Sequence, residues 1–202
     1  MGVPETTSYQ RDWSRRTIEH VLPKRSAEQF DKEGREQADL LNERIEPEFT
    51  VLDYGIGVGR VAKHIKAARV VGVDVSEKYL SMVPDGMETY LTNGTSIPLP
   101  DESVDFAYSL MVLQHCPLSD HATILAEIAR CLKPGATAYV QFPDSESDYY
   151  QDGPFVNTYT PGQVLRFVPG NCTATVSRGR LAGYGDGATP YRELILTMIK
   201  TS

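Results

Sequence analysis

The stretch that decides the fold is residues 51–65, VLDYGIGVGRVAKHI. An apolar, β-prone run leads there into three glycines at alternate positions, Gly55, Gly57 and Gly59. Glycine adopts positive φ without strain and lets a ligand approach the backbone closely. A glycine-rich turn after a buried strand is typical of a binding site for a nucleotide or a related small molecule. We expect a helix over residues 60–67 to follow the turn.

Strands and helices alternate on both sides of this turn. Apolar runs predict strands at 49–55, 69–75, 87–92, 104–111, 136–143, 171–179 and 191–200. Helical spacing and capping signals predict helices at 26–45, 77–83, 119–132 and from residue 160 onward. Alternating elements of this kind predict an α/β fold with a mostly parallel sheet and helices on both faces. Ligands bind such sheets at the carboxyl ends of the strands, where the glycines lie.

Bulk properties narrow the class of protein. The chain has 202 residues, a size that suits one domain. Its formal net charge of −7 is a poor match for a polyanion, so nucleic acid is not the expected partner. Three widely spaced cysteines, Cys116, Cys131 and Cys172, form neither a zinc pattern nor a disulfide framework, which favours the reducing cytoplasm. The chain lacks an apolar run of 18 residues, so no membrane span is expected.

Two aspartates indicate what the turn holds. A dinucleotide site would have glycine at the position of Arg60. Asp74 ends the second strand, 19 residues after Gly55, where a carboxylate can accept both ribose hydroxyls of an adenosine. Asp53 puts a negative charge beside the turn, which disfavours a pyrophosphate and favours a cation. S-adenosylmethionine, with a sulfonium, an ammonium and no phosphate, fits this charge.

With these residues the chain resembles the class I S-adenosylmethionine-dependent methyltransferases. VLDYGIGVGR resembles the first motif of that family, and VVGVDVS resembles the second, which carries the ribose-binding acid. TNGTSIPLPDESVDFAYSLMVLQHCP resembles the third and fourth motifs, and EIARCLKPGATAYVQFP resembles the helix, turn and strand that follow. The resemblance covers residues 49–143. It implies a Rossmann-like, doubly wound sheet of seven mostly parallel strands, the last one antiparallel.

The resemblance also implies a division of the chain. We expect one domain over residues 1–202, with an N-terminal helical segment or lid at 1–47. Residues 48–143 would form the cofactor-binding core. Residues 144–202 would supply a loop, a helix and the final strands on the side of the acceptor. Aromatic residues of the lid and of the 144–159 segment, Tyr159 among them, are candidates for lining the acceptor pocket.

Roles carry over from the family residue by residue. Backbone around Gly55, Ile56 and Gly57 is expected to contact the methionine part of the cofactor. Asp53 would hold the ammonium, directly or through water. Arg60 would pair with Asp53 or with a carboxylate.

The adenosine part has its own set of residues. Asp74 would bind the ribose hydroxyls, and Val75 would pack on the adenine. Asn93 stands where the family often has an acid and could accept from the adenine amino group, while Gly94 could donate its N–H to the ring. The alternative for this Asn-Gly pair is a simple turn.

Ser109 and Leu110 end the fourth strand and are expected beneath the methyl donor. Methyl transfer mainly requires alignment of the acceptor, so a general base is optional. His115 is the best candidate for a base, and local packing is its alternative role. No metal site is expected, and the only cofactor is S-adenosylmethionine, which leaves as S-adenosylhomocysteine.

The leading hypothesis is transfer of a methyl group to oxygen or nitrogen of a small molecule by direct displacement. The strand end SLMV, residues 109–112, lacks the prolines and the aromatic residue that shape a slot for a flipped base, which argues against nucleic-acid methylation. A non-catalytic or partner-dependent subunit and methylation of an exposed group on a macromolecule remain alternatives. A nicotinamide-dependent oxidoreductase is a third alternative, against which Asp53 and Arg60 count. The sequence does not predict the oligomeric state.

Overall fold

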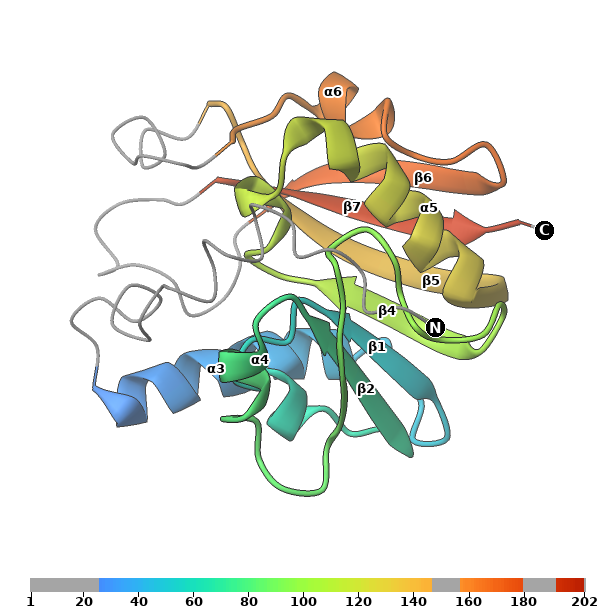
Figure 1. Cartoon of the computed structure of the whole chain (residues 1–202). Helices are drawn as coiled ribbons and strands as arrows, with labels where there is room; N and C mark the ends of the chain where they lie inside the picture. The colour runs from blue at the N-terminus through green and yellow to red at the C-terminus, as the bar shows by residue number, and fades with distance from the viewer. Residues whose placement is uncertain (1–25, 147–156, 180–191, 202) are drawn as a thin grey trace.

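One sheet of seven strands organises the computed structural model, which describes residues 26–146, 157–179 and 192–201. The strands are β1 (Thr50–Tyr54), β2 (Arg69–Asp74), β3 (Glu88–Leu91), β4 (Val104–Ser109), β5 (Leu132–Pro143), β6 (Cys172–Gly179) and β7 (Glu193–Lys200). Their order across the sheet is β3-β2-β1-β4-β5-β7-β6 (Figure 1).

The direction of the strands confirms the predicted fold class. Strands β1 to β5 pair in parallel, and β7 runs antiparallel to both of its neighbours, β5 and β6. The chain moves outward from β1 to β3 and then crosses back to β4 on the other side of β1. The fold is therefore a doubly wound α/β sheet whose order reverses between β1 and β4. A ligand is expected at the carboxyl ends of these two strands.

Helices cover both faces of the sheet, as predicted. They are α3 (Ala27–Asn42), α4 (Glu77–Leu80), α5 (His121–Cys131) and α6 (Pro161–Leu165), with 3₁₀ turns η1 (Ala62–His64), η2 (Leu113–His115) and η3 (Leu118–Asp120). On one face, Ile124 and Ile128 of α5 and Val164 of α6 join the larger apolar core. On the other face, Ala38 and Leu41 of α3 pack in a second core. Figure 1 shows α5 in front of the sheet and α6 beside β6.

The helix starts follow the capping residues read from the sequence. The Ser26 side chain accepts a hydrogen bond from the Gln29 N–H at 3.1 Å and so begins α3. The sequence pattern of Ser26 and Gln29 is that of a reciprocal capping box, but the Gln29 amide donates onward to Glu33, so the box is only half formed. At α6 the box is complete, because Thr160 and Gln163 each accept from the other's backbone.

The predicted helix over residues 60–67 is wrong. Only η1 forms there, and Ile65 is already extended, with φ −72° and ψ 132°. Asn42, the last residue of α3, turns the chain at this point: its side chain donates to the His64 carbonyl at 3.1 Å and accepts from the Lys66 N–H at 2.9 Å. These bonds direct the chain into β2 before a helix can develop. A smaller difference is that β5 begins at Leu132, ahead of the predicted strand at 136–143.

Helix α3 takes the place of the missing helix and braces the glycine turn. A Cβ on Gly34 would lie 2.4 Å from the Arg60 carbonyl oxygen, so only glycine lets α3 come this close. Asp31 forms an ion pair with Lys63 and a hydrogen bond, at 3.1 Å, with His64 Nε2. Residues 27–42 therefore belong to the helical layer on the sheet, and the part of the predicted lid at 1–25 lies outside the described residues.

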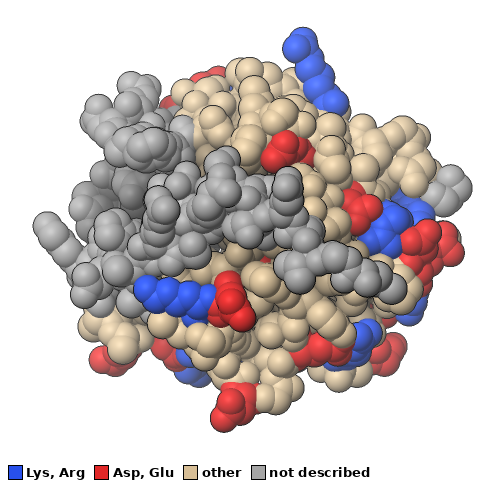
Figure 2. All heavy atoms as spheres, in the orientation of Figure 1, with Lys and Arg blue, Asp and Glu red and all other residues tan. Residues whose placement is uncertain are grey.

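The surface carries mixed charge. Figure 2 shows acidic and basic side chains interspersed over the face drawn, without a dense cluster of Lys and Arg among the described residues. In the segments that the structure describes, no helix is both long and apolar enough to cross a membrane.

Candidate cofactor site

The glycine turn sits at the carboxyl end of β1 and is shaped by positive φ angles, 85° at Gly55 and 56° at Gly57. The Gly55 N–H donates to the Val73 carbonyl at 2.8 Å, which joins the turn to β2. A Cβ on Gly55 would lie 2.3 Å from Val112 Cγ2, whereas a Cβ on Gly57 would meet nothing within 4 Å. Gly55 is therefore required by packing, and Gly57 leaves open space at the turn, as a ligand that lies against the backbone requires.

Ile56, between the two glycines, turns its side chain into the protein. It is buried, and it packs on Gly72 of β2, where a Cβ would lie 2.2 Å from Ile56 Cδ1. The large residue fits because its neighbour on β2 has no side chain. Only the backbone of Ile56 is thus available to a ligand at the turn, which agrees with the kind of contact predicted for it.

Asp74 is held by the turn itself. Its Oδ2 accepts from the Gly57 N–H and its Oδ1 from the Ser76 N–H, both at 2.9 Å. Burial raises the pKa of Asp74 above its usual value, and the N–H groups of Ser76, Gly57 and Val75 oppose that rise. A carboxylate can accept about four hydrogen bonds, so the carboxylate keeps capacity to accept from a ribose hydroxyl.

Asp53 lies on the α3 face of β1, opposite Tyr108 of β4 in the strand pairing. The Tyr108 hydroxyl donates to Asp53 Oδ2 at 2.7 Å, and Asp53 is only 4% exposed. Burial raises the pKa of Asp53 to about 7, and the charge of Asp74 adds to the rise; the Tyr108 hydrogen bond and the charge of Arg60 act against it. A cation bound beside this carboxyl would favour its ionised form.

Arg60 is turned toward α3. Its Nη2 donates to Gln37 Oε1 at 2.6 Å, and its guanidinium lies over the Phe30 ring, 5.2 Å from the centroid. No ion pair joins Arg60 to Asp53 within the described ranges. The Arg60 charge therefore acts on the pKa of Asp53 through space, without direct contact. A cofactor contact of Arg60 remains a prediction, and its observed contacts fasten the glycine turn to α3.

Residues 92–96, here called the adenine turn, follow β3. The Asn93 Oδ1 accepts from the N–H groups of Thr95 and Ser96, both at 3.0 Å. This is the turn-forming alternative for Asn93, and it occupies the oxygen that was predicted to accept from adenine. The Tyr54 hydroxyl donates to the Gly94 carbonyl and so ties the adenine turn to the end of β1. Roles for Asn93, Gly94 and the half-buried Val75 toward adenine stay predictions.

The end of β4 lies next to the glycine turn. Ser109 is buried, and its hydroxyl donates to the Tyr54 carbonyl at 2.9 Å, so it joins β4 to β1. Leu110 is partly buried against the core that includes α3. Met111 has a φ of 62°, and its N–H donates to Gln141 Oε1 at 2.6 Å. The contacts of Ser109 are thus structural, and a ligand role for either predicted residue stays untested.

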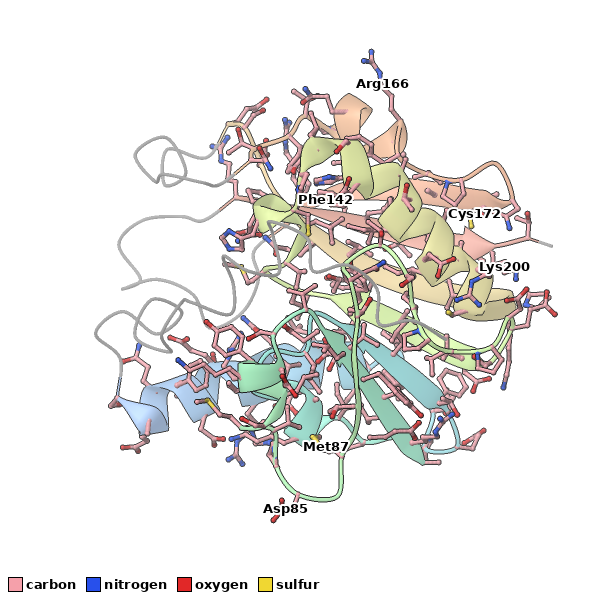
Figure 3. All side chains as sticks on the ribbon, viewed as in Figure 1. Asp85, Met87, Phe142, Arg166, Cys172 and Lys200 are labelled. Carbon is pink, nitrogen blue, oxygen red and sulfur yellow. The ribbon has the colours of Figure 1, made fainter. Side chains whose placement is uncertain are left out.

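Two histidines follow β4. His115 lies in η2 and is partly buried, and its role as a base stays a prediction. His121 is fully buried: its Nδ1 pairs with the Pro117 carbonyl at 2.9 Å and its Nε2 with the Tyr159 hydroxyl at 2.7 Å. Burial lowers the pKa of His121. Tyr159, a predicted pocket residue, therefore belongs to an aromatic core with His121 and Phe142, which Figure 3 labels.

Gln114 is a feature that sequence reasoning missed. It is 1% exposed, and among the residues that the structure describes its Oε1 has no hydrogen-bond donor and its Nε2 makes a single contact, at 3.8 Å with Met111 Sδ. The backbone around it is fixed, because the Asn157 N–H donates to the Gln114 carbonyl at 3.0 Å. A buried polar atom without a partner costs about 1–3 kcal/mol and calls for an explanation. A single glutamine in an apolar stretch carries no sequence pattern that would have singled it out.

Comparison with known proteins agrees with this geometry. Residues 52–140 match the model of a protein family described as a methyltransferase domain. The malonyl-[acyl-carrier protein] O-methyltransferase of Yersinia pestis is 35% identical over 92 residues, which are 43% of this chain and 34% of that protein. The trans-aconitate 2-methyltransferase of an Azoarcus species is 33% identical over 100 residues, 46% of this chain and 39% of that protein. The chain thus spans little more than a third of the length of these relatives.

Solved structures share the fold over nearly the whole chain. A methyltransferase of Haloferax volcanii, solved in complex with the Trm112 methyltransferase activator, superimposes with a TM-score of 0.70 at 16% identity and covers 96% of this chain and 98% of that one. A methyltransferase of Thermotoga maritima, described as a possible histamine N-methyltransferase, gives 0.69 at 18% identity, with 96% and 100% covered. The chain thus resembles a methyltransferase domain in sequence over residues 52–140 and shares its fold with these solved structures, in agreement with the resemblance read from the sequence.

No group of three or more His, Cys, Asp or Glu side chains that could hold a metal ion occurs in the portion that the structure describes.

The pKa of Asp53 makes a prediction about stability. The folded protein keeps the proton of the Asp53 carboxyl up to about pH 7, whereas the unfolded chain releases it near pH 3.8. Between these two pH values the free energy of unfolding therefore falls as the pH rises. Asp53→Asn removes the titration, so the variant should gain about 2–4 kcal/mol relative to the wild type between pH 4 and pH 8. Urea unfolding of both proteins at these two pH values measures the gain. A difference in stability that does not change with pH would contradict the assignment.

Proposed function

We propose that this protein is an enzyme that transfers a methyl group from S-adenosylmethionine to oxygen or nitrogen of a small molecule by direct displacement. One observation carries the proposal: the Gly57 N–H and the Asp74 carboxylate are bonded at 2.9 Å, next to the buried Asp53. This arrangement joins an open stretch of backbone, a carboxylate for a ribose and a carboxyl group for a cation. S-adenosylmethionine needs all three parts, whereas a dinucleotide shares the first two and is disfavoured by a carboxyl group beside its pyrophosphate.

The described residues suit each part of the cofactor. Asp74 would hold the ribose hydroxyls, and the backbone of residues 55–57 would lie against the methionine chain, where Gly57 leaves room. Asp53 would face the ammonium and ionise as that cation binds, since an opposite charge stabilises the carboxylate. When bound, S-adenosylmethionine supplies a methyl group already activated by its sulfonium. The protein then has to align the acceptor and exclude water.

The acceptor is proposed to be small because one relative named above acts on trans-aconitate and one structural neighbour is described as a possible histamine N-methyltransferase. The relative that acts on malonyl-[acyl-carrier protein] favours instead the alternative of an exposed group on a macromolecule. The acceptor would lie beyond the end of β4, on the side away from β2 and β3, where Asp74 and the adenine turn would hold the adenosine. His115 and Gln114 both lie in η2 at that end of β4. We propose that His115 can take a proton from the acceptor and that Gln114 Oε1 accepts a hydrogen bond from it.

A partner-dependent methyltransferase is the second candidate. The observation in its favour is the Haloferax volcanii neighbour, which was solved with an activator protein. In that case the isolated chain would bind the cofactor and show no turnover until a partner is added. Nucleic acid is the less favoured acceptor, given the formal net charge of −7. The cytoplasm is the proposed compartment, supported by three free cysteines.

Cofactor binding tests the proposal directly. Titration calorimetry with S-adenosylhomocysteine should give saturable binding. Asp74→Ala should weaken it by about 1–3 kcal/mol, the scale of lost hydrogen bonds to a charged group. Asp105→Ala is the control, because this aspartate lies at the start of β4, at the end of the strand opposite the glycine turn, and pairs with Lys133. Absence of binding by the wild type at millimolar ligand would contradict the proposed function.

The proposed role of Gln114 predicts that its substitution raises the stability of the protein and lowers its catalytic efficiency. Gln114→Met replaces an unsatisfied buried amide by an apolar side chain of similar size, so the melting temperature should rise, in line with a gain of about 1 kcal/mol. Affinity for S-adenosylhomocysteine should stay within about threefold, while kcat/KM for a turned-over acceptor should fall about tenfold, the loss of one hydrogen bond to the acceptor. Thermal melting, calorimetry and turnover measured on one preparation test this. A lower melting temperature would show that Gln114 stabilises the fold and would contradict the assignment.

A further inference from the structure

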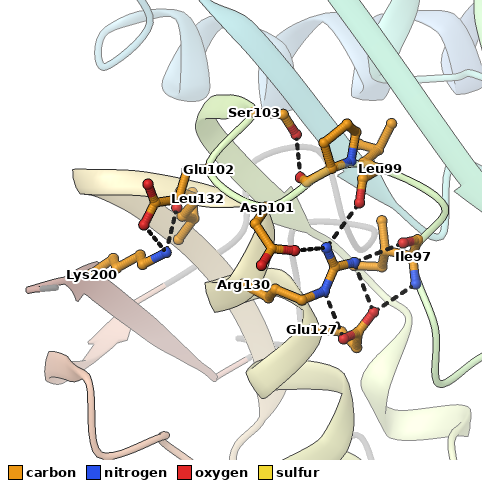
Figure 4. Close-up of polar contacts among 10 residues, drawn as sticks. Ile97, Leu99, Asp101, Glu102, Ser103, Glu127, Arg130, Leu132 and Lys200 are labelled. Carbon is orange, nitrogen blue, oxygen red and sulfur yellow. Dashed lines mark hydrogen bonds and ion pairs between the residues drawn. The ribbon is translucent and has the colours of Figure 1, made fainter.

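Arg130, in the last turn of α5, holds the loop that follows the adenine turn. Its Nη1 donates to the Leu99 carbonyl at 2.9 Å, and its Nη2 donates to the Ile97 carbonyl at 2.8 Å (Figure 4). It also pairs with Asp101 at 2.7 Å. One guanidinium thus reaches two backbone carbonyls and a side chain of the loop. The rigid fork of an arginine suits such a task, and the point charge of a lysine does not.

Glu127, one turn earlier in α5, completes the contact. Its Oε2 accepts from the Ile97 N–H at 3.0 Å and from Arg130 Nη2 at 3.0 Å, and its Oε1 accepts from Arg130 Nε at 2.9 Å. The N–H and the carbonyl of Ile97 are therefore both bonded to the same pair of side chains. The Ile97 side chain is itself buried in the core. We call Arg130 and Glu127 the α5 clamp.

The α5 clamp acts next to the adenine turn. Ile97 follows Ser96 directly, and Ser96 closes the turn: its N–H donates to Asn93 Oδ1 at 3.0 Å, and its carbonyl accepts from the Thr92 hydroxyl. On the opposite side, the Tyr54 hydroxyl holds the Gly94 carbonyl. The turn is thus fixed from two directions, by β1 at one end and by α5 at the other.

We propose that Arg130 is a positioning residue for the adenine ring, acting through Ile97 on the adenine turn. The inference rests on the proposed function, since it presumes that the turn receives the adenine of the cofactor. Arg130 contacts no part of the expected cofactor site itself. Loosening the clamp should leave Asp74 and the glycine turn in place. It should weaken the preference of the site for adenine over a base with different hydrogen-bonding groups on its edge.

The test compares two ligands that differ only at the base edge, S-adenosylhomocysteine and S-inosylhomocysteine, by calorimetry. The wild type should prefer the adenine compound by about tenfold or more, as expected for a site that hydrogen-bonds the amino group. Arg130→Met should reduce that preference about fivefold, and Glu127→Gln, which keeps the shape and weakens the ion pair, should reduce it less.

Lys200→Met is the matched control. Lys200 is a buried cation of the same region and donates to Glu102 Oε1 at 3.2 Å and to the Leu132 carbonyl at 3.0 Å (Figure 4), and among the described residues it bonds to neither Ile97 nor Leu99. Its loss should lower the melting temperature and leave the base preference unchanged. If Arg130→Met does not fold, Glu127→Gln decides the question alone.

The outcomes separate the inference from the proposed function. A wild type that binds neither compound contradicts the proposed function. A wild type that binds both equally, or an Arg130→Met protein that keeps the wild-type preference, overturns the positioning role. Equal changes of preference in the Arg130 and Lys200 variants would also overturn it, because they would reflect stability alone.

Discussion

The hydrogen bond from the Gly57 N–H to the Asp74 carboxylate is the contact on which the site depends. It joins the turn after β1 to the end of β2, and it forms because the parallel pairing sets Asp53 opposite Gly72, so the two strands end side by side. The bond needs a backbone at positive φ at residue 57, which glycine supplies without strain. Together with the bond from the Ser76 N–H to Oδ1, it fixes the orientation of the carboxylate. The geometry for a ribose is therefore built from backbone and one side chain.

The glycine turn and the loop after β3 are held in the same way, from opposite faces of the sheet. On one face, Arg60 of the glycine turn reaches back to Gln37 of α3. On the other face, Arg130 of α5 reaches forward to the carbonyls of Ile97 and Leu99. Each loop is thus fastened by a guanidinium to a helix that packs in its own apolar core. Preorganised loops of this kind lose less conformational freedom when a ligand binds.

The sequence predicted the strands well because apolar runs and their order reflect burial, which is a local property of each segment. The helix caps at Ser26 and Thr160 were likewise predicted from the local sequence. Asp74 and the glycines were predicted as a site from their spacing along the chain. The failures came from contacts distant in sequence. The chain at 60–67 does not form a helix because Asn42 bonds to it from α3. Ile56 fits only because Gly72 lies beneath it, and neither the isolation of Gln114 Oε1 nor the burial of His121 can be read from neighbouring residues.

A crystal structure of the protein with S-adenosylhomocysteine tests the central claim most directly. The account predicts that both ribose hydroxyls lie within hydrogen-bond distance of the Asp74 carboxylate while the Gly57 N–H keeps its bond to Oδ2. The homocysteine chain should pass over Gly57, with its ammonium toward Asp53. A ligand seated elsewhere on the sheet, or one whose ribose avoids Asp74, would contradict the account.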